Sequence, residues 1–302
     1  MGLATIDPPA TTCAWCAAGL PAEANRGGGR ALCERCGAAT TDPWPSEETL
    51  RSAYEGWYRP QSGRFAGPGD ALLKRSRGAL AKRLDAIAPP GPVLDVGAGD
   101  GTLIDALKQH GREATGLELV STRPDIRAAD ITEIAESGFA AIVFWHSLEH
   151  MTRPAAALAA AAQKLAPNGV LVIAVPNSDS LQAKAFGDRW LALDIPRHLV
   201  HLPARTLVDR LEQLGLHIGR TSHLRGGQVV FGWLHGLTGK LPGRPDLYDA
   251  IRKPEARRAA IPAGRRAAIL AAAAALTPVA AAAALAEAAM RRGGSIYVEA
   301  RR

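Results

Sequence analysis

Val93-Leu94-Asp95-Val96-Gly97-Ala98-Gly99-Asp100-Gly101-Thr102 is the stretch that decides the fold of this chain. Four residues suited to a buried strand run into three glycines at alternate positions, and apolar residues at helical spacing follow. This order of strand, tight turn and helix is the first half of a βαβ unit. Glycines allow the backbone to turn sharply close to a ligand, and the free N–H groups that open the next helix face that ligand.

A dinucleotide site also begins with a strand, a glycine turn and a helix, but its fingerprint requires a third glycine three positions after the second. Here Gly101 follows Gly99 after two positions, and position 102 is Thr. Asp95 and Asp100 in the same turn would repel a pyrophosphate. Two carboxylates suit a ligand with a cationic end and hydroxyls, and we therefore expect S-adenosylmethionine rather than a nicotinamide cofactor.

At these residues the sequence resembles the class I S-adenosylmethionine-dependent methyltransferases, whose first motif is a strand ending in Asp followed by Gly-x-Gly-x-Gly. The resemblance covers about residues 90–220. It extends to the order strand, Leu-Glu-His, helix, Pro-Asn-Gly, strand, Pro-Asn over residues 139–177. This order is similar to a bacterial group that includes ubiquinone-biosynthesis O-methyltransferases and glycan or sugar methyltransferases. The resemblance implies an α/β fold with a Rossmann-like, doubly wound, seven-stranded sheet whose last strand, 295–300, is antiparallel.

The resemblance also indicates which residues bind the cofactor. Glu118 ends the next expected strand, nineteen residues after Gly99, where an acidic residue hydrogen-bonds ribose hydroxyls. Asp130 is expected at the adenine amino group with Ile131 against the ring, although an ordinary helix N-cap also explains Asp130. The full expected cofactor site consists of Asp95, Gly97, Ala98, Gly99, Asp100, Gly101, Glu118, Leu119, Asp130, Ile131, Trp145 and His146.

A fully apolar segment, residues 139–145, is typical of a central parallel strand, and His146 to His150 follow it. Ligands bind outside the carboxyl ends of such strands. Methyl transfer often requires removal of a proton from the acceptor, and a neutral imidazole can accept it. We expect His150 or His146 as the base, and His198, in a Pro-Arg-His element over the site, to position or deprotonate the acceptor. Structural histidines in a polar loop are the alternative.

A second divalent ion is a further possibility at the same loop. His146, Glu149 and His150 lie at i, i+3 and i+4, and His198 or His201 is available from elsewhere. Such ligands can hold an ion that orients acceptor hydroxyls. Some related O-methyltransferases, including ones acting on RNA ends, use a Glu-x-x-Glu-His cluster in this way, but here His146 replaces the first Glu.

The four cysteines form two Cys-x-x-Cys pairs separated by sixteen residues, a spacing typical of a zinc-ribbon-like site. Four thiolates leave no open coordination position, so we expect structural zinc in an N-terminal module at residues 1–45. In similar bacterial methyltransferases such a module is thought to help shape the acceptor site. The expected ligands are Cys13, Cys16, Cys33 and Cys36.

A linker and an amphipathic helix are expected over residues 46–90, and the methyltransferase domain over 91–302. The linker region is rich in aromatic residues that either pack on the core or cover the active site: Trp44, Tyr54, Trp57, Tyr58 and Phe65.

A helical insertion is expected at residues 225–292, before the last strand. Within it, residues 267–290 carry one charge, Glu287, and are long enough to cross a membrane. We instead expect a helical hairpin broken at Thr277-Pro278, because a crossing would separate the last strand from its sheet. The hairpin either docks on the core or lies on a membrane surface, with peripheral contact through residues 252–292.

The net charge of +7 arises entirely from residues 251–302, which hold ten Lys/Arg and three Asp/Glu.

The N-terminus lacks a signal pattern, so we expect a cytoplasmic protein, peripheral at the inner membrane face if it contacts membrane. The expected function is methyl transfer to a small-molecule, sugar or lipid-linked glycan acceptor, on oxygen or carbon. An RNA methyltransferase and a non-catalytic, cofactor-sensing binding protein are the rivals. We do not expect nucleic acid as a partner, because residues 1–45 carry little positive charge.

Overall fold

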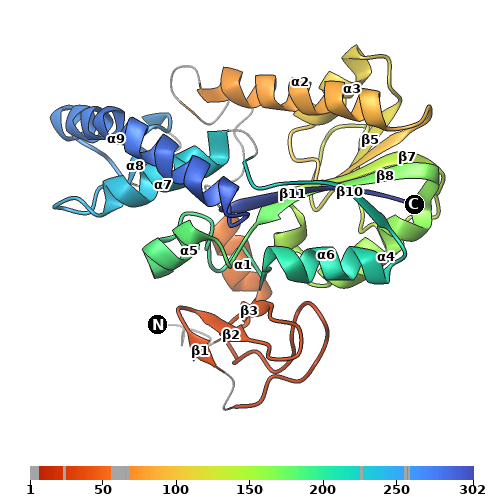
Figure 1. Cartoon of the computed structure of the whole chain (residues 1–302), viewed down its shortest axis with the longest axis horizontal. Coiled ribbons are helices and arrows are strands. Elements are labelled where there is room, and N and C mark those ends of the chain that lie inside the picture. Colours follow the sequence, from red (N-terminus) through yellow and green to blue (C-terminus); the bar gives the residue numbers. More distant parts are fainter. Residues whose placement is uncertain are drawn as a thin grey trace.

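The computed structural model describes residues 7–22, 25–55, 65, 69–224, 227–254, 257 and 259–302. The aromatic residues Trp57 and Tyr58 of the expected linker lie outside these residues. The described chain forms a central sheet with helices on both faces, a small sheet module near the N-terminus and a helical extension (Figure 1).

The central sheet has seven strands in the order β10-β11-β8-β7-β4-β5-β6. Strands β4 to β8 pair in parallel, and β11 is antiparallel to both of its neighbours. The expected seven-stranded doubly wound sheet with an antiparallel last strand is therefore confirmed. The strands are β4 (Val93–Val96), β5 (Ala114–Glu118), β6 (Ile126–Ala128), β7 (Phe139–Trp145), β8 (Leu165–Pro176), β10 (His217–Ser222) and β11 (Ser295–Arg301).

Helices on both faces explain why the central strands are largely apolar, with Asp95 of β4 as a buried exception. α2 (Gly69–Ile87) and α3 (Thr102–Gln109) cover one face, and α4 (Pro154–Lys164) and α6 (Ala204–Gln213) cover the other (Figure 1). All four residues of β4 and the first six of β7 are buried. Two apolar cores result, one on each side of the sheet.

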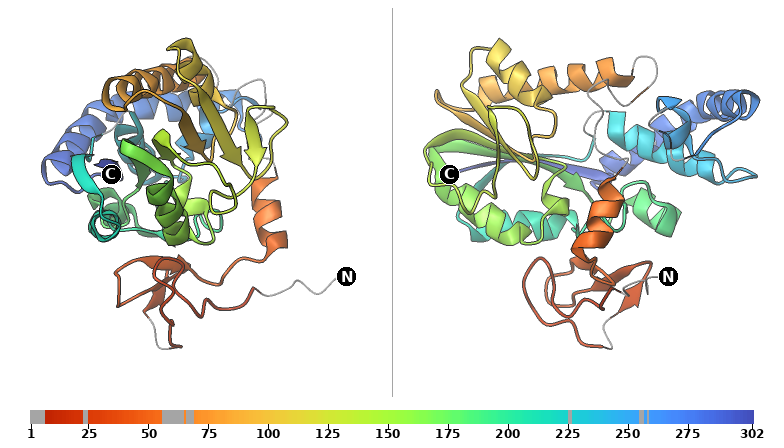
Figure 2. Two further views of the ribbon diagram at one scale, coloured as in Figure 1. Left: turned by 90° about the vertical axis from the view of Figure 1, so that its right-hand side faces the viewer. Right: turned by 180° about the vertical axis from the view of Figure 1, so that it is seen from behind.

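The N-terminal module contains β1 (Arg26–Gly27), β2 (Arg30–Leu32) and β3 (Ala39–Thr41). Its fourth strand is β9 (Val200–His201), which pairs antiparallel with β3. Helix α1 (Glu47–Tyr54) leads from the module to the main body (Figure 2). The module and the segment that follows Pro-Arg-His are thus parts of one small sheet.

The insertion before β11 forms α7 (Gly227–Gly239), α8 (Leu247–Ala250) and α9 (Ala263–Ala289). The expected break at Thr277-Pro278 is wrong, because α9 runs through Pro278 as one helix. A proline inside a helix removes its own N–H from the helical bonds and crowds the carbonyl four residues earlier, at a cost of about 3 kcal/mol. The Thr277 hydroxyl donates to the carbonyl of Ala273 at 2.9 Å, and packing against α7 and α8 supports both halves of the helix.

Candidate functional site

The glycine turn after β4 has the left-handed backbone that its sequence indicates. Gly97, Gly99 and Gly101 have φ of 82°, 57° and 78°. A Cβ at position 97 would lie 2.2 Å from the Cβ of Ser147, in the loop after β7. The turn and that loop therefore pack with no room for a side chain, and the absence of a side chain at position 97 is a structural requirement.

Glu118, at the end of β5, holds the turn from the side. One oxygen of its carboxylate accepts from the N–H of Gly99 at 2.8 Å and the other from the N–H of Leu119 at 2.9 Å. Beyond it, Leu119 is 79% exposed and Val120 is 63% exposed. Exposed apolar side chains beside an acidic strand end provide a flat surface on which an adenine ring can pack. These contacts fit S-adenosylmethionine at the carboxyl ends of β4 and β5.

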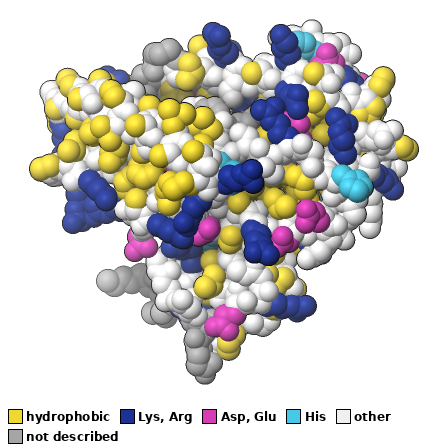
Figure 3. All heavy atoms as spheres, in the orientation of Figure 1, with side chains coloured by type: hydrophobic (Ala, Val, Ile, Leu, Met, Phe, Trp, Pro, Cys, Tyr) yellow, Lys and Arg dark blue, Asp and Glu magenta, His cyan; other side chains and the backbone are white. Residues whose placement is uncertain are grey.

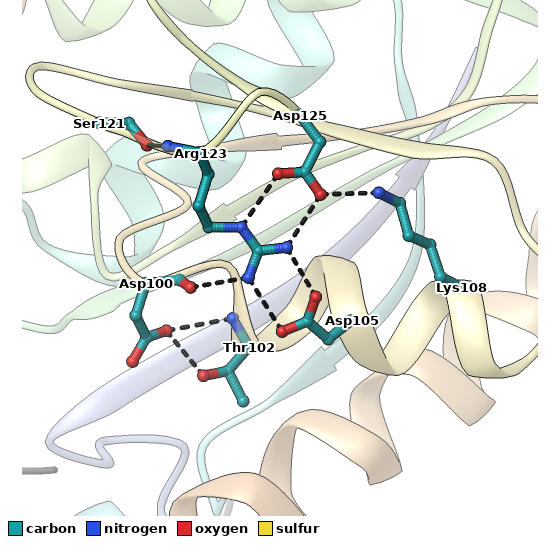
Figure 4. A network of polar contacts seen from close by, with 7 residues as sticks. All are labelled: Asp100, Thr102, Asp105, Lys108, Ser121, Arg123 and Asp125. Carbon is teal, nitrogen blue, oxygen red and sulfur yellow. Dashed lines mark hydrogen bonds and ion pairs between the residues drawn. The ribbon is translucent and has the colours of Figure 1, made fainter. Parts of the chain in front are cut away.

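Arg123, which the sequence did not single out, is hydrogen-bonded to the glycine turn after β4 (Figure 4). The Arg123 guanidinium donates to both oxygens of Asp105, to both of Asp125 and to the backbone carbonyl of Asp100. The bonds to Asp105 and then Asp125 raise the pKa of Arg123 above its usual value. The Asp100 carboxylate accepts from the N–H and hydroxyl of Thr102, which opens α3. Asp100 therefore bonds the first residue of α3 from the position before its N-cap, Gly101, and no local sequence pattern indicates the role of Arg123.

The other expected cofactor residues lie around this edge of the sheet. Asp95 and Ala98 are buried, at the end of β4 and under the turn. Exposed Asp130 accepts from the N–H and hydroxyl of Thr132 in a turn, so the helix N-cap interpretation is wrong, and Ile131 lies fully in the core. Half-buried Trp145 ends β7, with the Arg77 guanidinium 5.0 Å from its ring centre. The roles of these residues in binding remain predictions.

The three expected histidines do meet, around one buried carboxylate. His146 follows β7 with φ 52°, and Glu149 and His150 lie in the short helix η1 (Leu148–His150). Glu149 is 2% exposed; its Oε1 is 3.4 Å from His146 Nδ1 and 3.9 Å from His198 Nε2. The rings of His150 and His198 are 4.6 Å apart. The loop after β7 and the segment 190–199 therefore share one polar cluster.

Contacts with backbone carbonyls indicate which ring nitrogen carries a proton in His150 and in His198. His150 Nδ1 lies 2.9 Å from the carbonyl oxygen of Arg197, and His198 Nδ1 lies 2.9 Å from that of Ala192. A carbonyl only accepts, so each of these Nδ1 atoms carries a proton. His146 has Nδ1 toward Glu149, and its buried Nε2 has no hydrogen-bond partner among the described residues.

The protonation states follow from burial and charge. Burial raises the pKa of Glu149, but the hydrogen bond from His146 and the charges of the neighbouring histidines outweigh it and lower that pKa to about 2. Burial, and then the charge of His198, lowers the pKa of His150 to about 4. At neutral pH the cluster therefore contains an ionised carboxylate and a neutral His150 imidazole.

Tyr54, at the end of α1, also reaches the cluster. Its hydroxyl lies 3.0 Å from His150 Nδ1, and burial raises the pKa of Tyr54 to about 12. The sequence singled out Tyr54 only as one of several aromatic residues near the linker. Its contact with His150 spans 96 positions, so no local spacing could have indicated it.

The four cysteines come together as their spacing indicates. The Sγ atoms of Cys13 and Cys36 are 3.7 Å apart, those of Cys16 and Cys33 are 3.6 Å apart, and all four lie within 4.8 Å of one another. A tetrahedral zinc with Zn–S bonds of about 2.3 Å requires Sγ separations of about 3.8 Å. The donor set and its geometry therefore fit Zn²⁺.

The cysteine module contacts the histidine cluster through β3 and β9. The Thr41 hydroxyl donates to the carbonyl of His198 and lies 3.0 Å from His201 Nε2. The Thr206 hydroxyl donates to the carbonyl of Cys36 at 2.8 Å. The backbone of His198 is therefore held directly by a strand of the module.

Comparison with known proteins agrees with this geometry. Residues 72–219 match the model of a family described as "Methyltransferase domain". The ubiquinone biosynthesis O-methyltransferase of Xanthomonas campestris is 27% identical over 143 residues, which cover 39% of this chain and 60% of that protein. Residues 72–219 are therefore similar to a methyltransferase domain, and the sheet and the glycine turn have the arrangement that this similarity leads us to expect.

Two solved structures share the general arrangement. A SAM-dependent methyltransferase from Archaeoglobus fulgidus superposes with a TM-score of 0.42 at 17% identity, covering 75% of this chain and 94% of that one. A cyclopropane synthase from Mycobacterium tuberculosis gives 0.45 at 18% identity, covering 75% and 83%. Both scores are below 0.5, so the assignment depends on the family match and the curated relative.

Proposed function

We propose that this protein transfers a methyl group from S-adenosylmethionine to a hydroxyl of a small-molecule, sugar or lipid-linked glycan acceptor. The observation that carries the proposal is the pairing of His146 with the buried Glu149 at the carboxyl end of β7, beside the glycine turn. The chain spans 60% of the length of the curated ubiquinone-biosynthesis relative, whose name indicates a small-molecule acceptor and transfer to oxygen.

In this proposal, different residues around the glycine turn bind different parts of S-adenosylmethionine. When bound, the cofactor supplies an electrophilic methyl group on its sulfonium. Glu118 retains lone pairs for ribose hydroxyls beyond the two N–H groups that it already accepts. Leu119 provides an apolar surface for the adenine, and Asp95 adds negative charge near the cationic end.

His146 is the base in this proposal. Glu149 faces Nδ1 of His146 and thereby fixes the proton on that nitrogen, so Nε2 takes the proton of the acceptor hydroxyl. The Glu149 carboxylate then stabilises the imidazolium that forms. His150 and His198, fixed by the carbonyls of Arg197 and Ala192, position the acceptor from the other side.

The cysteine module holds structural Zn²⁺ in this proposal, because four thiolates leave no coordination position for a substrate. A second divalent ion at Glu149 and His150 remains a prediction. Donor atoms of Glu149, His150 and His198 lie within 4.8 Å of one another, which supports it. Titration of Mg²⁺ or Mn²⁺ into the zinc-loaded protein, followed by calorimetry, tests that site.

The proposed function is tested by transfer of label from tritiated S-adenosylmethionine into fractions of a cell extract. We expect label in a small-molecule or glycolipid fraction. His146→Asn should reduce the rate about 10²–10⁴-fold, while the protein still binds S-adenosylhomocysteine. A fully active His146→Asn protein would exclude this base. Absence of S-adenosylhomocysteine binding by the unaltered protein would exclude the proposed function as a whole.

The rival of an RNA methyltransferase makes a different prediction. It requires RNA binding that weakens steeply with salt, because phosphate contacts dominate such affinity. Residues 1–45 contain three arginines and four acidic residues, which gives the module no basic surface for this purpose.

A further inference from the structure

Helix α9 presents an apolar face that the rest of the described chain leaves uncovered. It is 27 residues long, apolar enough to cross a membrane by length and composition, and only 22% of its most apolar 18-residue window is buried. Hydrophobic side chains gather over the α7–α9 region in Figure 3, with Lys and Arg side chains along the border of that area. Exposed apolar patches of this kind mark interaction surfaces.

The exposed residues recur at helical spacing along one side of α9, which we call the outer face. No charged residue occurs from position 267 to 286. Val279, Leu285 and Met290 are the large side chains of this side, at 54%, 59% and 53% exposure. The alanines between them are Ala268, Ala271, Ala275, Ala282, Ala286 and Ala289.

The charges around the outer face are mostly positive. Residues 227–292 contain ten Lys/Arg and four Asp/Glu. Among the described residues of this range, Lys240, Arg244, Arg265 and Arg291 are exposed, and the Asp246 side chain is 43% exposed. Arg265 and Arg291 lie at opposite ends of a helix about 40 Å long. An apolar strip with cations at both ends complements the headgroups and outer acyl region of an anionic bilayer.

The inner face of α9 excludes a crossing. Ile269 and Ala273 pack on α8, and the buried Glu287 accepts from Trp233 Nε1 at 2.7 Å and from the backbone N–H of Gln182 at 3.0 Å. A lipid environment on all sides would remove these contacts. β11 also enters the sheet between β8 and β10 directly after the helix, which keeps both ends of α9 on one side.

We propose that α9 lies in the plane of an anionic lipid bilayer, with its outer face in the headgroup and acyl boundary and its inner face on the protein. Gln182 belongs to α5 (Leu181–Phe186), at the start of the segment that leads to His198. Hydrogen bonds of Glu287 therefore connect α9, the helix that contacts the bilayer, to the segment that leads to the histidine cluster. Membrane attachment of this kind would bring a lipid-linked acceptor to the site, and this last consequence depends on the proposed function.

Vesicle co-sedimentation of the full chain tests the surface without any need for methyl transfer. We expect binding to vesicles that contain about one third phosphatidylglycerol and weak binding to pure phosphatidylcholine, with the difference reduced at about 0.5 M salt. Leu285→Asp and, separately, Val279→Asp should lower the partition coefficient about tenfold or more. Leu72→Asp is the matched control, because Leu72 is a leucine of α2 with 64% exposure.

Calorimetry with S-adenosylhomocysteine and thermal unfolding verify that each variant is folded. Three results would overturn the proposal. The first is no vesicle binding by the unaltered chain, and the second is an equal loss of vesicle binding for Leu72→Asp. The third is a chain that forms dimers, if Leu285→Asp disrupts the dimer and leaves vesicle binding unchanged. The last outcome would assign the outer face to a second copy of the chain. Vesicle binding without S-adenosylhomocysteine binding would refute the proposed function and leave the surface intact.

Discussion

Gly97→Ala is the most direct test of the cofactor site, because two separate constraints favour glycine at position 97: its backbone conformation and its close contact with Ser147. Its φ of 82° is one that a residue with a Cβ adopts at a cost of about 1–2 kcal/mol. The new Cβ would also lie 2.2 Å from that of Ser147, so the turn and the loop after β7 must separate by more than about 1 Å to reach ordinary contact.

The expected loss of affinity follows from that displacement. A misplacement of about 1 Å can cost about 100-fold in the rate of an enzyme reaction, and we take the same order for binding of the cofactor. We therefore expect the Kd for S-adenosylhomocysteine to rise about 100-fold in Gly97→Ala, measured by isothermal titration calorimetry. Urea unfolding in parallel should show a larger loss of stability than backbone strain alone would produce.

Gly138→Ala separates strain from the clash. Gly138 has a nearly identical φ of 81°, but nothing lies within 4 Å of a Cβ placed there. Its replacement should lower the free energy of unfolding by about 1–2 kcal/mol and leave affinity unchanged. Adding Ser147→Gly to Gly97→Ala should restore part of the affinity, relative to Ser147→Gly alone. If Gly97→Ala binds S-adenosylhomocysteine as tightly as Gly138→Ala does, the turn does not form the cofactor site.

Two further predictions concern the metal and the effect of acid. Cys33→Ser should reduce zinc from one ion per chain to none and destabilise the N-terminal module; unchanged zinc by elemental analysis would exclude the four-thiolate site. Because the pKa of His150 is lowered to about 4, the unfolded chain binds a proton between pH 6.5 and 4 that the folded chain does not. The proton on His150 should therefore lower stability across that window by about 3 kcal/mol, and His150→Gln should remove this part of the fall, while buried His201, whose pKa is also lowered, keeps its own contribution. The lowered pKa of Glu149 adds a second loss between pH 4.5 and 2. A urea midpoint that is equal at pH 7 and pH 4.5 would contradict the assigned burial.

The features that the sequence predicts correctly are those encoded locally. The apolar runs of β4 and β7, the alternate glycines and the Cys-x-x-Cys spacing each specify their surroundings within a few residues. Glu118 is identified by its distance from Gly99, because a βαβ unit has a nearly fixed length. These patterns predict which strand ends carry the cofactor site and which cysteines lie together, without knowledge of tertiary contacts.

The remainder depends on partners that are distant in sequence. The contact of Tyr54 with His150 and the pairing of β3 with β9 leave no periodic trace. The bonds of Arg123 join three acidic residues that individually resemble ordinary surface charges. At Pro278 a local rule predicts a break, and packing against α7 and α8 overrides it.

The shared strand β9 also has a consequence for biosynthesis. Residues 39–41 leave the ribosome about 160 positions before residues 200–201, an interval of about 8–30 s at 5–20 residues per second. During that interval the thiols can capture their ion, yet the edge of β3 stays open until the nascent methyltransferase domain supplies its partner. A chain interrupted before residue 200 would thus display an unpaired strand edge, which is a site for aggregation and a mark that quality-control proteases can recognise.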